Sequence, residues 1–158
     1  MTSLPRYFED FEVGRVIDCG GRTISKEEIM AFAKEFDPQP IHIDERYAAQ
    51  HHFGEIVGSG LHVLGICMRH AVDTFLRDAV TLGSPGTESI KFFKPLRPER
   101  KLRVIAKITD KIPSRSRPDR GRIKLCLELH DEKEGLLAEW ISYGIFRRRD
   151  VLEDNRHA

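Results

Sequence analysis

One long apolar stretch, residues 61–77, constrains the fold more than any other part of the chain. Apolar side chains recur there at the three- and four-residue spacing of an α-helix, and Val63, Ile66 and Cys67 extend the apolar surface around it. A helix that is apolar on most sides has to be buried. With a rise of about 1.5 Å per residue it would be about 25 Å long, the width of a small domain. The rest of the chain therefore has to surround it.

The rest of the sequence has the pattern of a β-sheet that could surround this helix. Apolar and polar residues alternate with the period of a β-strand in five runs: residues 16–24, 89–96, 102–109, 123–130 and 137–147. In the first run, Gly20 and Gly21 predict a bend or bulge. Consecutive runs joined by short connections favour an antiparallel sheet. One buried helix and five such strands fit together if the sheet curls around the helix. We therefore predict an α+β fold, with one domain over residues 1–150 and a polar tail over 151–158.

Charge and cysteine usage exclude several classes of protein. Lys and Arg number 26 against 25 Asp and Glu, which gives a net charge of +1, whereas a nucleic-acid-binding protein is expected to have a strongly basic face. The three cysteines contain no CxxC pair, which argues against a disulfide framework and a zinc ribbon. The chain begins with no signal-peptide pattern, and no apolar run approaches the roughly 20 residues of a membrane span. We therefore expect a cytoplasmic protein.

Two prolines divide the segment that follows the first predicted helix. A capping box predicts that helix over residues 25–36. Proline interrupts regular helix, so Pro38 and Pro40 predict a stiff, extended loop that holds Asp37 and His42 in a fixed relation. A carboxylate and an imidazole placed in this way are a candidate acid–base pair. Taken singly, Asp37 would be a helix-end residue and His42 a buried core histidine; their spacing favours catalysis.

A glycine-rich turn, Gly58-Ser59-Gly60, precedes the long apolar helix. Glycine permits close approach of the backbone, and free amides at the start of a helix can hold a developing negative charge. Ser59 and Gly60 are therefore candidate oxyanion or substrate-binding residues, although Gly60 could be a plain hinge. His62 follows closely enough to line a pocket, and its alternative is a place on the helix surface or at an interface.

The chain resembles the MaoC-like dehydratases, which include the (R)-specific enoyl-CoA hydratases, in the motif Asp37-Pro38-Gln39-Pro40-Ile41-His42-Ile43-Asp44 and in the Phe53-Gly54 and Ser59-Gly60-Leu61 that follow it. The resemblance covers nearly the whole chain. It implies the hot-dog fold, in which a curved sheet wraps around a central helix. It also implies that Asp37 and His42 are the catalytic pair and that the Gly60 amide binds the thioester oxygen.

The same resemblance implies a substrate class and an assembly. Members of the family act on acyl thioesters of coenzyme A or acyl carrier protein, use no metal and build their sites near a dimer interface. This sequence has Gln39 where the family usually has Asn, and Gly65 where many hydratases carry a serine. We expect Gln39 to be a substrate-binding residue.

The expected activity is hydration of a 2-enoyl-CoA, or the reverse dehydration of a 3-hydroxyacyl-CoA, as in fatty-acid metabolism. The expected assembly is a homodimer or an assembly of dimers, with no cofactor other than the coenzyme A of the substrate. A hot-dog acyl-CoA thioesterase and a non-catalytic acyl-CoA-binding module are the alternatives. Hydration is favoured because thioesterases of this fold usually lack the histidine of the pair.

Two further groups of side chains were candidates for ligand binding. His42, Asp44, His51 and His52 suggest a metal site, but they lack a motif such as HExxH, and Asp44 suits a helix N-cap better, so we expect no metal. A basic loop over residues 113–122 could hold the phosphates of coenzyme A, since guanidinium groups pair well with phosphate. A merely solvated loop is the alternative; the candidates in it are Arg115, Arg117 and Arg120.

Overall fold

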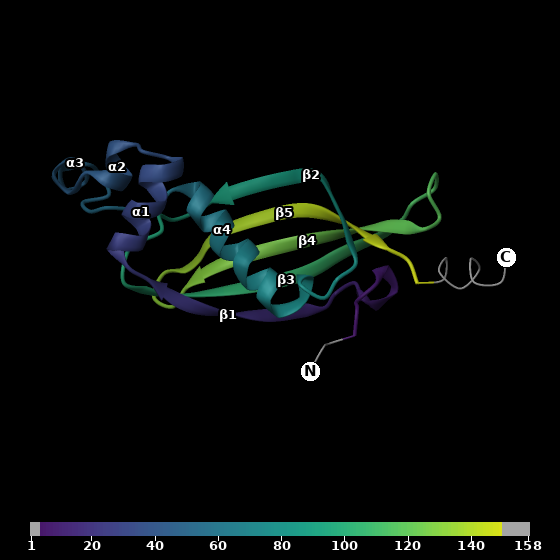
Figure 1. The fold of residues 1–158 in the computed structure, drawn as a ribbon. Coiled ribbons are helices and arrows are strands. Elements are labelled where there is room, and N and C mark those ends of the chain that lie inside the picture. The colour runs from purple at the N-terminus through teal and green to yellow at the C-terminus, as the bar shows by residue number, and fades with distance from the viewer. Residues whose placement is uncertain (1–3, 150–158) are drawn as a thin grey trace.

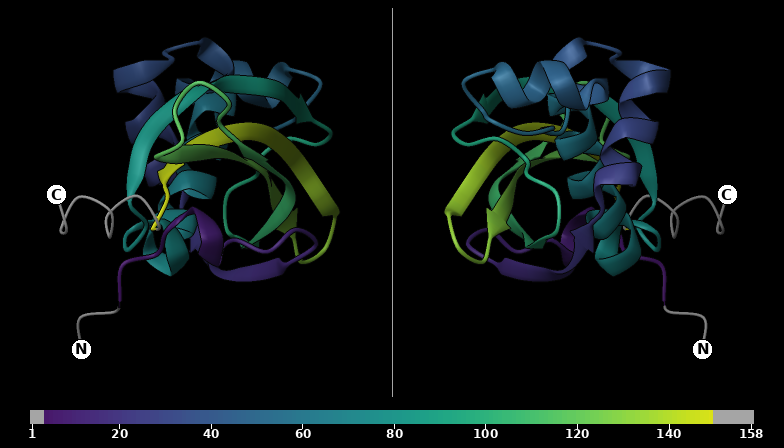
Figure 2. Two further views of the ribbon diagram at one scale, coloured as in Figure 1. Left: turned by 90° about the vertical axis from the view of Figure 1, so that its right-hand side faces the viewer. Right: turned by 90° about the vertical axis from the view of Figure 1, so that its left-hand side faces the viewer.

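A computed structural model describes residues 4–149, so the expected tail over 151–158 lies outside the described residues. Five strands form one antiparallel sheet in the order β1-β3-β4-β5-β2. Their bounds are β1 Val16–Ile24, β2 Thr81–Phe92, β3 Arg100–Pro113, β4 Arg120–Asp131 and β5 Gly135–Arg147. The sheet curls around a central helix, as the side view and the two end views show (Figures 1 and 2). The predicted α+β architecture is confirmed.

The central helix consists of α4 (Gly60–Ala71) and the wider π-helical turn η2 (Val72–Leu76) that continues it. Together they match the helix predicted over residues 61–77. The buried face of α4 includes Val63, Ile66 and Cys67, and it packs on the inner face of the sheet. Because each fully buried aliphatic side chain contributes about 1.5–3 kcal/mol, this contact fixes the helix on the sheet.

A bulge in β1 forms where the paired glycines predicted it. Gly20 has a φ of 74°, in the left-handed region that favours glycine, and the pairing of β1 with β3 shifts register between Asp18 and Gly21. A Cβ atom on Gly21 would lie 1.8 Å from the carbonyl oxygen of Leu102. Only glycine therefore lets β1 approach β3 this closely.

The predicted bounds of β2, residues 89–96, were wrong. The strand begins at Thr81 and runs through Pro85 and Gly86, which were expected to precede it. Proline is tolerated because β2 is an edge strand, whose one partner strand among residues 4–149 is β5, so the missing N–H leaves no bond unmade within this sheet. Gly83 and Gly86, with φ of 109° and 143°, absorb the register shifts. The basic loop is also shorter than predicted, because β3 and β4 extend to Pro113 and from Arg120.

Three short helices gather at the end of the sheet where α4 begins (Figure 1). They are α1 (Lys26–Phe36), α2 (Pro40–Ile43) and α3 (Glu45–Gln50), while a 3-10 turn, η1 (Phe8–Asp10), precedes β1. Ser25 and Glu28 form the expected capping box, and Asp44 caps α3 as predicted. Among residues 4–149, no helix is long and apolar enough to cross a membrane.

Candidate functional site

The two predicted catalytic residues lie on either side of the short connection between α1 and α2. Asp37 is the C-terminal cap of α1, and His42 lies on α2. The extended loop predicted for this segment is therefore correct only in part. Pro40 occupies the first position of the one-turn helix α2, where the missing N–H costs nothing, and Gln39 before it is extended as expected.

His42 is buried, with 6% of its surface exposed, and one ring nitrogen has a fixed partner. Its Nδ1 lies 2.6 Å from the carbonyl oxygen of Val57. Because a carbonyl only accepts hydrogen bonds, Nδ1 carries a proton. In the neutral imidazole, Nε2 then has a free lone pair, and it faces Asp37 Oδ2 at 3.4 Å. Val57 is part of the site through its backbone, which the side-chain pattern did not reveal.

Asp37 is held by two side-chain donors. Ser59 Oγ donates to Asp37 Oδ2 at 2.6 Å, and Gln39 Nε2 donates to Asp37 Oδ1 at 2.7 Å. The Ser59 bond first, then the Gln39 bond, lower the pKa of the Asp37 carboxyl, and the neighbouring His42 adds to this against the opposing effect of burial. Asp37 is therefore ionised at neutral pH. Gln39, expected to bind substrate, acts here as a partner of the carboxylate.

Ser59 links the carboxylate to the central helix. It is completely buried, and its Oγ also accepts a hydrogen bond from the backbone N–H of Leu61 at 3.2 Å, as the N-cap of α4. The sequence prediction treated Ser59 as a substrate-binding residue. The structure shows a positioning contact, for which the signal is the serine immediately before a long helix. Ser59 also lines a smaller hollow at the start of α4, so its role in substrate binding stays a prediction.

The backbone N–H of Gly60 is available to a ligand. It is the first residue of α4, and it donates to no acceptor among residues 4–149. Gly60, Asp37 and His42 line one pocket of about 360 Å³, whose other walls are largely apolar. These walls include Ile41, Phe53, Val57, Val63, Phe92, Phe93 and Leu96. Gln39, expected to bind substrate, lines the same pocket, so the structure brings four of the predicted residues together there.

The geometry of the pair creates a place for a water molecule. When the imidazole is neutral and its Nδ1 proton is donated to Val57, His42 Nε2 and the ionised Asp37 Oδ2 are both acceptors. A water can donate one hydrogen to each, which orients its oxygen lone pair away from both groups. Such a water is activated for addition when Nε2 takes its proton.

His62 does not line this pocket, contrary to the prediction. Its ring stacks on Phe32 of α1, with centroids 4.4 Å apart and an interplanar angle of 8°. The third position of α4 faces α1, so the side chain fills the space between the two helices. Its Nδ1 is buried without a hydrogen-bond partner, and burial lowers the pKa of the imidazole.

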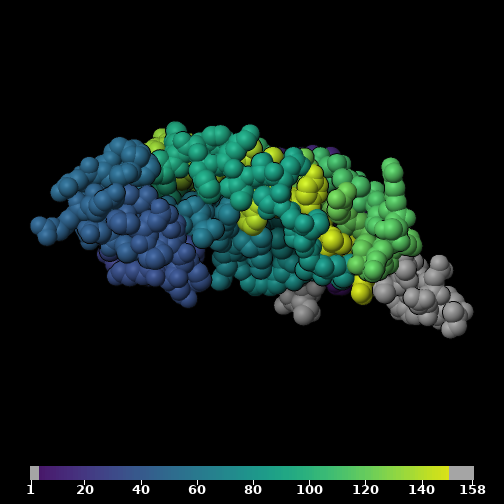
Figure 3. Space-filling model, turned by 90° about the horizontal axis from the view of Figure 1, so that it is seen from above, coloured from purple at the N-terminus to yellow at the C-terminus, as the bar shows by residue number. Residues whose placement is uncertain are grey.

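The basic loop lies at the other end of the molecule, so the structure does not place Arg115 and Arg117 beside the site (Figure 3). Arg120 is in β4, nine residues from Leu129, which is level with Phe92 beside the site. Nine strand residues correspond to about 30 Å. The prediction that this loop holds the phosphates of a thioester bound in the same chain is therefore not supported. The physical reason is that β3 and β4 pair over almost their full length, so the loop that joins them lies at the far end of the sheet.

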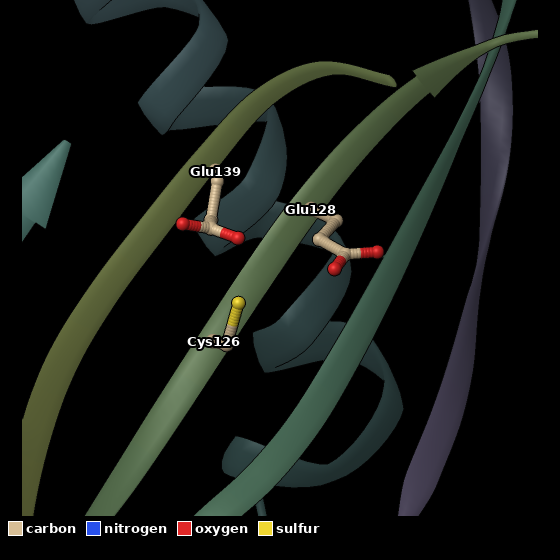
Figure 4. A group of neighbouring side chains, drawn as sticks. All are labelled: Cys126, Glu128 and Glu139. Carbon is tan, nitrogen blue, oxygen red and sulfur yellow. The ribbon is translucent and has the colours of Figure 1, made fainter. Parts of the chain in front are cut away.

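A different group of side chains has the composition of a metal site. Cys126, Glu128 and Glu139 lie on the face of the sheet turned away from α4, with ligand atoms within 4.8 Å of one another (Figure 4). The Lys107 ammonium already pairs with Glu128, and His130 bonds the same carboxylate at 2.9 Å. Burial raises the pKa of the Cys126 thiol to about 11, so it stays protonated. Lys107 is the cation of this cluster, and we assign the group no metal.

The sequence and fold of this chain are similar to those of known proteins. Residues 10–125 match the MaoC like domain. The chain belongs to the MaoC-like family. This is a family of hydratases and dehydratases, and the resemblance inferred from the motif around Asp37 and His42 is confirmed at the level of the family.

Two relatives of this MaoC-like protein are similar over most of the chain. The uncharacterized protein YdeM of Bacillus subtilis (strain 168) is 32% identical over 127 residues, which cover 80% of this chain and 88% of YdeM. A 3-hydroxybutyryl-CoA dehydratase of Methylorubrum extorquens is 30% identical over 116 residues, which cover 70% of this chain and 69% of the relative.

The crystal structure of the MaoC-like dehydratase from Rhodospirillum rubrum superposes with a TM-score of 0.80 at 30% identity. The match covers 91% of this chain and 98% of that chain. The hot-dog fold expected from the sequence is therefore confirmed.

Proposed function

We propose that this MaoC-like protein is a hydro-lyase that adds water to a 2-enoyl-CoA or removes it from a 3-hydroxyacyl-CoA. The observation that carries the proposal is the convergence of three groups on one pocket. An ionised Asp37, the free lone pair of His42 Nε2 and the unpaired N–H of Gly60 lie together there. The similarity to a 3-hydroxybutyryl-CoA dehydratase supports the same class of substrate.

Each group then has a defined role. Water donates its hydrogens to Asp37 Oδ2 and His42 Nε2, and its oxygen attacks C3 of the enoyl group while Nε2 takes one proton. The negative charge that moves to the thioester oxygen is held by the Gly60 N–H. His42 returns the proton to C2 on the same face, so water is added with no net change in the enzyme. Acid–base help is worth about 10²–10⁴-fold and one oxyanion donor about 10²–10³-fold.

The hydrogen bonds at Asp37 decide which group is the base. Ser59 and Gln39 lower the pKa of the carboxyl, which makes Asp37 a weak proton acceptor. His42 Nε2 has no such donor on it and is the better base. Asp37 orients the water and stabilises the imidazolium that forms 3.4 Å away. These steps use only side chains, backbone and water, and coenzyme A enters as part of the substrate.

We also propose that the protein acts as a homodimer joined along β2. Among residues 4–149, no strand pairs with the outer edge of β2. An unpaired edge is a template for another strand. Large apolar side chains are exposed beside it on β2 and α4: Leu61, Met68, Ile90 and Phe92. A molar mass by light scattering of twice the chain mass, reduced to one chain by Ile90→Lys, tests the dimer.

The activity is tested with 2-enoyl-CoA thioesters of graded chain length and branching. The proposal predicts loss of the enoyl absorbance with no release of free thiol, and loss of this activity in Asp37→Asn and His42→Gln. A thermal unfolding curve for each variant separates lost chemistry from lost fold. Release of free thiol would instead show a thioesterase, and binding of thioesters without any change in them would show a binding module.

A further inference from the structure

The Phe92 ring lies against the first residue of the central helix. Phe92 is the last residue of β2, and half of its surface, 52%, is exposed. A Cβ atom built on Gly60 would lie 2.7 Å from Cζ of this ring, so a side chain there would force the ring to move. The absence of a side chain at Gly60 thus lets the ring sit directly over the helix start, beside the N–H proposed to hold the thioester oxygen.

The ring stands between two hollows that meet at the catalytic residues. One, of about 360 Å³, contains His42, Phe53 and Lys94. The other, of about 290 Å³, contains Leu61, Leu64 and Ile90. Three residues line both hollows: Asp37, Gly60 and Phe92. Of these, Phe92 contributes the only large apolar side chain, so its ring forms the wall that the hollows share.

The two hollows differ in chemistry. Along the Leu64 side, the apolar surface continues by one helical turn to Met68, where a further hollow of about 470 Å³ is lined by Val72 and Trp140. This side suits a hydrocarbon chain, and the partner subunit of the dimer proposed above would cover it. The other side carries Gln39 and Lys94, whose polar groups suit the amide-containing arm of a thioester.

We infer that Phe92 is a specificity-determining residue, a partition that separates the acyl chain on the Leu64 side from the thiol-bearing arm on the His42 side. The inference rests on the proposed function and names the part of the same site that selects the acyl group. A thioester bound across Asp37 and Gly60 has the ring beside its first acyl carbons. The ring therefore favours a straight chain and excludes substituents next to the thioester carbonyl.

Two sets of variants test this partition. In Phe92→Ala, the ratio of kcat/KM for a methyl-branched 2-enoyl-CoA to that for the straight chain should rise about tenfold or more, because one methyl group in a pocket is worth 10–200-fold. Gly60→Ala keeps the backbone N–H but places a methyl group against the ring, and it should lower kcat/KM by about 100-fold. Adding Phe92→Ala to Gly60→Ala should restore at least about tenfold of that loss.

Phe93→Ala is the matched control. Phe93 is equally exposed, at 51%, and lines only the His42 side, so it should not rescue Gly60→Ala. The inference is overturned if Phe92→Ala leaves the ratio unchanged in an active enzyme, or if it fails to rescue Gly60→Ala although both variants unfold at the wild-type temperature. Wild type that hydrates no 2-enoyl thioester refutes the proposed function instead.

Discussion

Removing the Ser59 hydroxyl should weaken the fold and the site together. Ser59 Oγ makes two bonds: it donates to the ionised Asp37 and accepts from the first turn of α4. Loss of an N-cap side chain costs about 1 kcal/mol, and loss of a hydrogen bond to a charged group costs about 1.5–3 kcal/mol. We therefore expect Ser59→Ala to lower the free energy of unfolding by about 2.5–4 kcal/mol at neutral pH.

Ser59→Gly separates the two contributions. Glycine is nearly as good an N-cap as serine, so this variant should lose only the bond to Asp37, about 1.5–3 kcal/mol. Urea unfolding at fixed protein concentration, followed by the fluorescence of Trp140, the single tryptophan, measures both variants. In the active enzyme both should also lower kcat, because Asp37 is no longer held toward the water.

The difference in stability between wild type and Ser59→Gly should change with pH in one direction. The folded-state pKa of Asp37 lies below its ordinary 3.8, so its contribution to stability is present above pH 3.8 and is lost as the pH falls through the folded-state value. The difference between wild type and Ser59→Gly should therefore shrink in acid. A difference that stays constant down to the acid transition, or one below about 0.5 kcal/mol at pH 7, would refute the reasoning.

Three other substitutions follow from single contacts. His62→Phe should keep the stacking on Phe32 and remove the unpaired Nδ1, which raises the free energy of unfolding by about 1 kcal/mol. Because the folded-state pKa of His62 is lowered, the wild type should become less stable relative to this variant as the pH falls below 6.5. Urea unfolding at each pH measures the difference. Gly21→Ala should cost about 1–3 kcal/mol by collision with Leu102 O, whereas Gly65→Ala, with open space at its Cβ, should not destabilise; thermal unfolding compares them. Lys107→Met should leave two opposed glutamates without their cation and lower Tm at pH 7, and the effect should shrink as the pH falls below 4.5 through the lowered folded-state pKa of Glu128.

The parts of the fold that depend on local pattern were predictable from the sequence. The central helix, the Ser25 cap and the bulge at Gly20 each reflect a property of the residues themselves, and each formed where expected. The bounds of β2 were not predictable in this way. A proline disrupts a strand that has a neighbour on each side, because it lacks the backbone N–H. Pro85 is tolerated because β2 lies at the edge of the sheet, and that position is a property of the whole fold.

The candidate site shows the same division. The pairing of Asp37 with His42 followed from their spacing around two prolines. The role of Ser59 as a partner of Asp37 depends on the packing of α1 against the start of α4, and the carbonyl of Val57 carries no side-chain signal. Phe92 lies within the predicted strand, but its approach to the helix start depends on how the end of β2 packs against α4, which no local pattern reveals.

The most direct test of the proposed function follows an oxygen label. Wild-type protein is incubated with a 2-enoyl-CoA in water enriched in ¹⁸O, and the products are analysed by mass spectrometry. The proposal predicts an intact thioester that carries one ¹⁸O in a hydroxyl group at C3, and no such product with Asp37→Asn. Label found in the carboxylate of a free acid, together with free coenzyme A, would contradict hydration and show hydrolysis of the thioester.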